Sequence, residues 1–124
     1  MSDPAQSMTF ESAGRSGVGA GRSAVCPYYH QAVELIGKRW TGAIVEALLP
    51  EPLRFSEIAQ AIPQISDRLL SMRLRELESE GIVERQVLDG SPVRVEYTLT
   101  PKGYALEPAI GALRDWAREW LQPL

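Results

Sequence analysis

A change of hydrophobic period near residue 82 limits the choice of fold more than any other feature. Before it, two helical patterns are joined by a tight turn at "PQI". Ser56 is expected to cap the short helix "SEIAQAI", which ends at Pro63, and Ser66 is expected to cap the longer helix "SDRLLSMRLRELESEG". After it, apolar and polar residues alternate in "IVERQVL" and "VRVEYTLT", and "DGSP" between them predicts a turn. A short helix, a longer helix and a hairpin in this order predict a winged helix-turn-helix.

The remaining chain is expected to be helical around this motif. Pro27 and Gly37 bound one predicted helix. A second is expected from about Trp40 to Leu49, with its apolar side chains buried: Trp40, Ile44, Val45, Leu48 and Leu49. Thr100 precedes a final helical region that Pro108 kinks or restarts and that reaches Leu121. The predicted fold class is α+β, mainly helical, with a two-stranded wing and additional N- and C-terminal helices.

Composition divides the chain into a tail and one domain. Residues 1–25 are rich in Ser, Gly and Ala and predict a disordered tail, which leaves 26–124 as the folded part. No run of about 18 apolar residues is present to span a membrane, and the start lacks a signal-peptide pattern, so a cytoplasmic location is expected. The single cysteine, Cys26, cannot form a disulfide within the chain.

The net charge of −3 conceals an uneven distribution. Residues 64–75 carry three arginines and one aspartate, a local charge of +2, whereas residues 76–84 carry four glutamates and no basic residue, a local charge of −4. A local basic patch matters more to a phosphate backbone than the total charge does. The glutamates should repel DNA, so the N-terminal half of the longer helix is expected to face it.

At about 100 degrees per residue, the longer helix has an apolar side formed by Leu70, Leu74 and Leu77. The side chains predicted to enter the DNA major groove lie opposite or lateral to it: Arg68, Ser71, Met72 and Arg75. Arginine can bind phosphate or guanine, serine can donate or accept, and methionine can contact a thymine methyl group. Ser66 adds a helix start that favours phosphate. The alternative is a solvated helix face.

In the hairpin, Ser91 near the tip and Arg94 are candidates to grip the flanking DNA backbone, with Arg85 on the partner strand. An ordinary cross-strand Arg/Glu surface pair is the competing interpretation.

The last predicted helix has a wide apolar face. One stripe holds Ala109, Leu113, Trp116 and Trp120, and an adjacent one holds Leu106, Ile110, Ala117 and Leu121. A small winged domain cannot cover both stripes, which predicts a homodimer rather than an ordinary core helix. A dimer would place two recognition helices roughly 34 Å apart, on successive major grooves of an inverted repeat.

Three segments resemble the HxlR-type, MarR-like winged helix-turn-helix transcriptional regulators: "CPYYHQAVELIGKRWTGAIVEALL", "RFSEIAQAIPQISDRLLSMRLRELESEGIVER" and "VRVEYTLTPKGYAL". The resemblance implies a DNA-binding homodimer in which the N- and C-terminal helices form the interface. The residues expected there are Tyr28, Tyr29, Ile110, Leu113, Trp116 and Trp120. Many relatives have Gly-Gly-Lys-Trp where this chain has "IGKRWT", so either Lys38 or Arg39 takes the role of the usual lysine in contacting DNA, with Ser56 at another helix end.

Cys26 and His30 are four residues apart, and Cys26 directly precedes Pro27, where it is the expected N-cap. The start of a helix attracts negative charge, and relatives with this Cys-Pro include thiol sensors of oxidants and electrophiles, which makes Cys26 a candidate redox sensor. The alternative is a cysteine that only packs. A groove lined by Tyr28, Tyr29, Trp116 or Trp120 is a candidate site for a small hydrophobic effector.

Two other classes of function compete with a regulator. One cysteine and one histidine are too few for a zinc site, and no phosphate loop or acid motif accompanies them, so neither an enzyme nor a cofactor or metal is expected. A winged-helix protein-interaction module without specific DNA binding is the second alternative. For a regulator, repression is favoured, because a compact dimer blocks a promoter by occupying it.

Overall fold

The computed structural model describes residues 14–17, 19–22 and 24–122, which fall into two compact units with the boundary after Lys38. The first unit contains strands β2 (Gly14–Gly17) and β3 (Gly19–Arg22), paired antiparallel, and helix α1 (Pro27–Ile36). The composition of residues 1–25 predicts disorder. Residues 1–13, 18 and 23 of that tail lie outside the described residues, and β2 and β3 form a short glycine-rich pair of the kind that is marginally stable alone.

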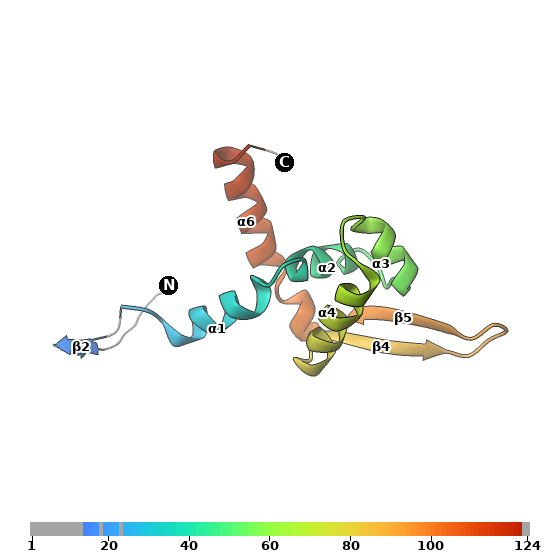
Figure 1. Ribbon diagram of the computed structural model, residues 1–124, viewed down its shortest axis with the longest axis horizontal. Helices are drawn as coiled ribbons and strands as arrows, with labels where there is room; N and C mark the ends of the chain where they lie inside the picture. Colours follow the sequence, from blue (N-terminus) through green and yellow to red (C-terminus); the bar gives the residue numbers. More distant parts are fainter. Residues whose placement is uncertain (1–13, 18, 23, 123–124) are drawn as a thin grey trace. The chain divides into compact units, whose positions relative to one another are not determined.

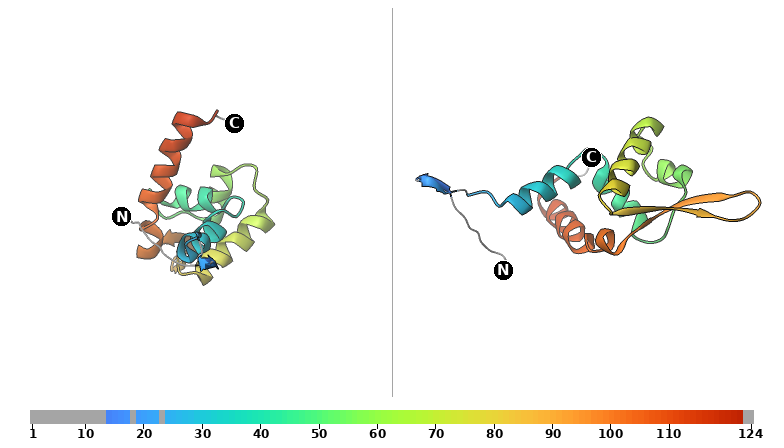
Figure 2. Two further views of the ribbon diagram at one scale, coloured as in Figure 1. Left: turned by 90° about the vertical axis from the view of Figure 1, so that its left-hand side faces the viewer. Right: turned by 90° about the horizontal axis from the view of Figure 1, so that it is seen from below.

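The second unit is a winged helix-turn-helix followed by two helices (Figure 1). Its elements are α2 (Thr41–Leu48), α3 (Phe55–Ala61), α4 (Asp67–Ser79), β4 (Val83–Leu88), β5 (Arg94–Leu99), α5 (Pro101–Tyr104) and α6 (Glu107–Trp120). The predicted order of helices and hairpin is confirmed. Figure 2 shows β4 and β5 running side by side away from the helices, as a wing does.

The core of this unit lies where α2, α3 and α4 meet the base of the hairpin. Its buried apolar side chains are Ile44, Val45, Leu48, Ile58, Ile62, Ile65, Leu70, Leu74, Leu77, Ile82, Val83 and Leu99. The extended link before α3 joins this base, because Leu53 and Tyr97 exchange two backbone hydrogen bonds of 3.0 and 2.7 Å. Leu53 thus forms a third strand-like segment beside the wing.

The starts of α2 and α3 each depart from the prediction in one detail. Trp40 is not helical: it precedes α2 in a left-handed conformation, with a φ of 74°, and is only half-buried. Ser56 is not a cap, because α3 begins one residue earlier and Arg54 is the N-cap residue. The Glu57 carboxylate accepts a hydrogen bond of 2.7 Å from the Arg54 backbone amide, the bond that a glutamate in the first helical turn makes to its N-cap residue.

One expectation of burial also changes. Leu49 follows the end of α2 and is half-buried instead of buried. Val93 precedes β5 and is 58% exposed, and the apolar side of that strand is buried only at Leu99, next to the core. Pro108 lies in the first turn of α6, which confirms a restarted helix instead of a kinked one.

Candidate nucleic-acid interface

Helix α4 has the two sides that its sequence predicts. Leu70, Leu74 and Leu77 are buried, whereas Arg68, Met72 and Arg75 are exposed and Ser71 is half-buried. The Arg75 Nη1 donates a hydrogen bond of 3.1 Å to the Ser71 hydroxyl, which holds the guanidinium along the helix surface. The structure therefore gathers the four predicted DNA-reading side chains on the accessible side of one helix.

The N-terminus of α4 is capped as predicted. The Ser66 Oγ accepts a hydrogen bond of 3.1 Å from the Leu69 backbone amide, which satisfies one of the free amides of the first turn. The Ser66 hydroxyl keeps its own proton to donate to a phosphate. Asp67 adds a negative charge to this turn, so the helix start is less attractive to an anion than its cap alone implies.

The C-terminus of α4 is tied to the segment that follows the wing. The Lys102 ammonium donates to the Glu80 carbonyl at 2.6 Å, and the Thr100 hydroxyl donates to the Gly81 carbonyl at 2.5 Å. Gly103 lies so close to the Ile82 carbonyl that a β-carbon would collide with it. A cation on the final carbonyls compensates for the acidic residues of this helix end. No pattern in the sequence predicted this contact.

The wing carries its predicted arginine in an ion pair within one strand. Arg94 Nη2 lies 2.9 Å from Glu96 Oε2, and the two residues share one face of β5, so the predicted cross-strand pair is not the one that forms. The Arg94 side chain is 56% exposed and accessible to a DNA backbone. Ser91 is exposed at the tip, and Arg85 is exposed on β4.

The remaining predicted contact residues lie at helix ends. Lys38 and Arg39 are both exposed, one at the end of each compact unit. The Arg39 guanidinium lies over the Trp40 ring, 5.1 Å from its centroid. Ser56 is exposed in the first turn of α3. Which of Lys38 and Arg39 contacts DNA stays a prediction.

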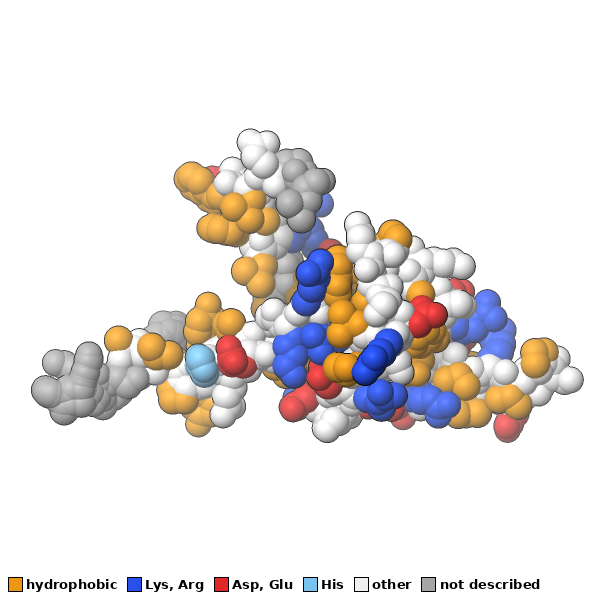
Figure 3. Space-filling view, viewed as in Figure 1, with side chains coloured by type: hydrophobic (Ala, Val, Ile, Leu, Met, Phe, Trp, Pro, Cys, Tyr) orange, Lys and Arg blue, Asp and Glu red, His pale blue; other side chains and the backbone are white. Residues whose placement is uncertain are grey.

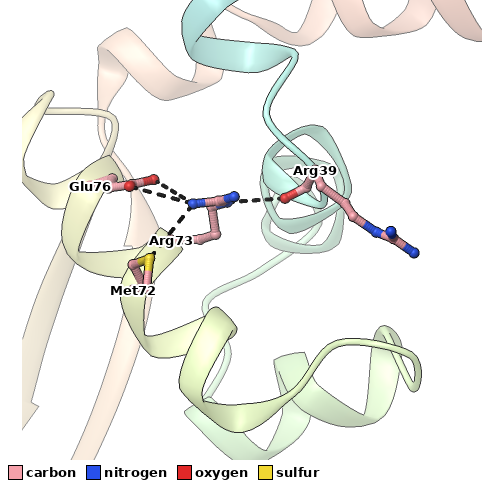
Figure 4. A network of polar contacts seen from close by, with 4 residues as sticks. All are labelled: Arg39, Met72, Arg73 and Glu76. Carbon is pink, nitrogen blue, oxygen red and sulfur yellow. Dashed lines mark hydrogen bonds and ion pairs between the residues drawn. The ribbon is translucent and has the colours of Figure 1, made fainter.

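Arg73, which lies between the two sides of α4, was not among the predicted residues. Its side chain is 16% exposed, and its guanidinium binds the Glu76 carboxylate and the Arg39 carbonyl (Figure 4). The spacing of Arg73 and Glu76 by three residues is a signal that could have indicated the ion pair, but not the carbonyl.

The candidate dimer surfaces are exposed in each unit considered separately. On α6, Leu113, Trp116 and Trp120 are 63%, 53% and 67% exposed, and no residue of this helix is buried. Figure 3 shows hydrophobic side chains gathered along α6. Ile110 is half-buried. On α1, Tyr28 and Tyr29 are also strongly exposed.

Cys26 is an exposed free thiol at the N-cap of α1, as its position before Pro27 predicts. Its side chain makes no capping bond, while its carbonyl accepts from the His30 amide at 3.0 Å. Cys26 is therefore not buried within the first unit. Over residues 24–122 no group of three or more His, Cys, Asp or Glu side chains is placed to hold a metal ion. No helix in the described part is long and apolar enough to cross a membrane.

A helix-turn-helix with an exposed basic face on its second helix, followed by a two-stranded wing, defines the winged helix-turn-helix class of regulators. The family model described as HxlR-like helix-turn-helix matches residues 35–124, and the chain belongs to this family. The chain is thus a helix-turn-helix transcriptional regulator, and the resemblance seen in its sequence is confirmed.

Proteins of Bacillus subtilis (strain 168) are similar along most of the chain. The uncharacterized HTH-type transcriptional regulator YvaP is 50% identical over 102 residues, which are 82% of this chain and 94% of YvaP. The reduced form of the transcriptional regulator YodB from B. subtilis has a TM-score of 0.73 at 47% identity and covers 81% of this chain and 98% of its own. YodB structures with bound quinone and after diamide treatment are also similar.

A second solved regulator is similar at lower identity. The redox regulator HypR in its oxidized form has a TM-score of 0.73 at 35% identity and covers 79% of this chain and all of its own. A reduced form of HypR matches with a TM-score of 0.70.

Proposed function

We propose that this regulator binds a specific double-stranded DNA operator as a homodimer in the cytoplasm and represses the adjacent promoter, under the control of Cys26 or a small effector. The observation that carries the proposal is the exposed face of α4, where Arg68, Ser71, Met72 and Arg75 stand above a buried leucine stripe. These side chains supply both phosphate binding and base contacts.

The apolar surface of α6 supports the homodimer. Three large side chains of this helix, Leu113, Trp116 and Trp120, are each more than half exposed, and such a patch favours association with a second copy. With twofold symmetry, each copy contributes one α4 and one wing, so the operator would be an inverted repeat with half-sites one helical turn apart.

The exposure of Cys26 supports control by thiol chemistry. A quinone would be attacked by the Cys26 sulfur at a ring carbon, and an oxidant such as diamide would join the sulfur to a second thiol in a disulfide. The second thiol would come from the other copy or from a small thiol, because the chain has one cysteine. Relatives captured in reduced, oxidized, diamide-treated and quinone-bound forms support this class of effector.

The recognition face is tested with DNA selected from a random duplex library. Arg68→Ala and Arg75→Ala should each weaken binding of the selected duplex by about tenfold or more in an anisotropy titration, because an arginine base contact contributes about 1–3 kcal/mol. Replacing an arginine that binds phosphate should also reduce the log-log salt slope by about 0.9 for each phosphate that is no longer bound.

Arg118→Ala, which removes an exposed arginine from α6, is the matched control and should leave binding unchanged. Equal affinity of wild type and both α4 variants would refute the recognition face. Failure of the wild type to enrich any duplex would favour a protein-interaction module.

Thiol control is tested by comparing the native protein with Cys26→Ser. A quinone or diamide should change DNA affinity only when the cysteine is present, and dithiothreitol should reverse the effect of diamide but not that of a stable quinone adduct. The same response in both proteins would remove Cys26 from the mechanism.

A further inference from the structure

The side chain of Arg73 is held by partners on both sides. Its Nε donates to the Arg39 carbonyl at 3.1 Å, and its Nη1 lies 3.2 and 3.4 Å from the two carboxylate oxygens of Glu76. With 16% of its side chain exposed, Arg73 differs from Arg68 and Arg75, which belong to the same helix but are exposed. Its guanidinium therefore binds groups within the protein.

The carbonyl that Arg73 binds belongs to a conformationally unusual part of the backbone. It is part of the peptide group between Arg39 and Trp40, and Trp40 has a φ of 74°. A bulky residue rarely adopts this left-handed conformation, which persists where surrounding contacts hold it in place. The orientation of that peptide group determines φ at Trp40, so the Arg73 bond stabilises the left-handed turn.

This turn fixes the start of α2. The Trp40 carbonyl accepts the amide hydrogen bond of Ile44 at 3.0 Å, and Ile44 is fully buried in the core. Arg73 therefore joins the recognition helix to the first turn of α2, across a separation of 34 residues in the chain.

The chemistry of this contact requires arginine. A guanidinium is planar and presents Nε and Nη1 in fixed directions, so it can bind a carbonyl and a carboxylate at once without rotating. A lysine ammonium supplies the charge but not this fixed pair of donors. Figure 4 shows the Arg39 side chain extending away from Arg73, so only the Arg39 carbonyl, and not its positive charge, meets the guanidinium.

We propose that Arg73 is a positioning residue for DNA recognition. It holds α4 against the turn before α2, so that the face formed by Arg68, Ser71, Met72 and Arg75 is presented to the major groove, and it makes no bond to DNA itself. This inference rests on the proposed function for its DNA readout, whereas its structural part concerns the turn at Trp40.

The experiment compares Arg73→Gln with Arg75→Gln, the same substitution two residues further along the helix. The full-length variants are titrated with the library-selected duplex over a salt series from about 50 to 200 mM. Arg73→Gln should bind about tenfold or more weakly with an unchanged log-log salt slope. Arg75→Gln should bind more weakly, with a slope reduced by about 0.9 for each phosphate that is no longer bound.

Hydrogen exchange of the free proteins supplies a readout that does not depend on DNA. The peptide containing Trp40 and Thr41 should exchange faster in Arg73→Gln than in wild type, and should be unchanged in Arg75→Gln. Exchange in the rest of the core should stay as in wild type, whereas general destabilisation would accelerate it everywhere. Arg73→Lys should show the same local acceleration, since it lacks the fixed pair of donors.

Several results would overturn the proposal. A reduced salt slope in Arg73→Gln, or full recovery of affinity in Arg73→Lys, would make Arg73 a phosphate contact. Wild-type exchange at Trp40, or general acceleration in Arg73→Gln, would also refute it.

If Arg73→Gln does not fold, Glu76→Gln replaces it: this variant keeps the Arg39 contact, so affinity should fall less and the salt slope should not change. An unchanged affinity would refute the proposal. If the wild type binds no selected duplex, the proposed function fails, while the exchange measurement still decides whether Arg73 holds the turn.

Discussion

Helices α4 and α6 have nearly the same length, 13 and 14 residues, and both carry an apolar stripe, yet only α4 buries it. In α4, Leu70, Leu74 and Leu77 are almost inaccessible to solvent. In α6, Leu113 and Trp116 are more than half exposed. The apolar side of α4 is therefore covered by other parts of the same chain, whereas the apolar side of α6 faces solvent.

The difference shows that an amphipathic helix by itself does not identify what covers its apolar side. Helix α4 packs in the three-helix core beside the hairpin, where its leucines are enclosed by other elements. Helix α6 contacts α2 and is joined to it by an ion pair between Arg114 and Glu46, but this contact leaves the tryptophans outside. A second copy of the chain is the occupant we propose.

The largest expected effect is the loss of dimerisation when a charge is placed on the apolar side of α6. Trp116→Glu would place a charge in the proposed interface and should raise the dimer dissociation constant by about a thousandfold, or about 4 kcal/mol. Sedimentation velocity over a concentration series measures this change. Asp115→Lys, at an exposed position outside the tryptophan stripe of the same helix, is the control that should leave association intact. A Trp116→Glu protein that associates as wild type does would exclude α6 from the interface.

The next largest effect is expected on the free energy of unfolding, when a leucine of the buried side of α4 is shortened. In the Trp116→Glu background, where association does not contribute, Leu74→Ala should reduce the free energy of unfolding by about 3 kcal/mol, since it creates a cavity in the core. Leu113→Ala, at a side chain that is 63% exposed, should change it by less than about 0.5 kcal/mol. Urea unfolding followed by circular dichroism decides this, and similar losses for both variants would contradict the comparison.

The smallest effect concerns the contact between α6 and α2. Arg114 Nη2 lies 2.7 Å from Glu46 Oε2, but the two side chains are 37% and 51% exposed. A double-mutant cycle with Arg114→Ala and Glu46→Ala should give a coupling energy below about 1 kcal/mol that decreases as salt is added. A larger, salt-independent value would mean that the chain's own contacts hold α6 firmly.

Helix α4 was predictable because its determinants are local. Ser66 supplies the cap, the leucine spacing supplies the buried side, and Gly81 follows the helix end with a positive φ of 74°. The hairpin was predictable for the same reason, from alternation and a turn. The exposed recognition face followed from the helical period alone.

The left-handed turn before α2 was not predictable, since a contact that is remote in the sequence supports it. At Trp40, a left-handed turn is supported by the side chain of Arg73, which is remote in the sequence. The N-cap of α3 was missed although its determinant is local, because the Glu57 carboxylate accepts from the backbone amide of Arg54, three residues earlier. Short helices are sensitive to such choices, since one residue is a large share of their length.

The sequence by itself determined the winged helix-turn-helix order, the two sides of α4 and the family, because periodicity and motifs are properties of neighbouring residues. Only the tertiary structure decided what the charged side chains of α4 and its surroundings do. Arg75 remains outside, Arg73 turns inward to a carbonyl 34 residues away, and Lys102 binds one 22 residues away. Backbone carbonyls are the same for every amino acid, so no residue type in the sequence reveals which of them a distant cation will bind.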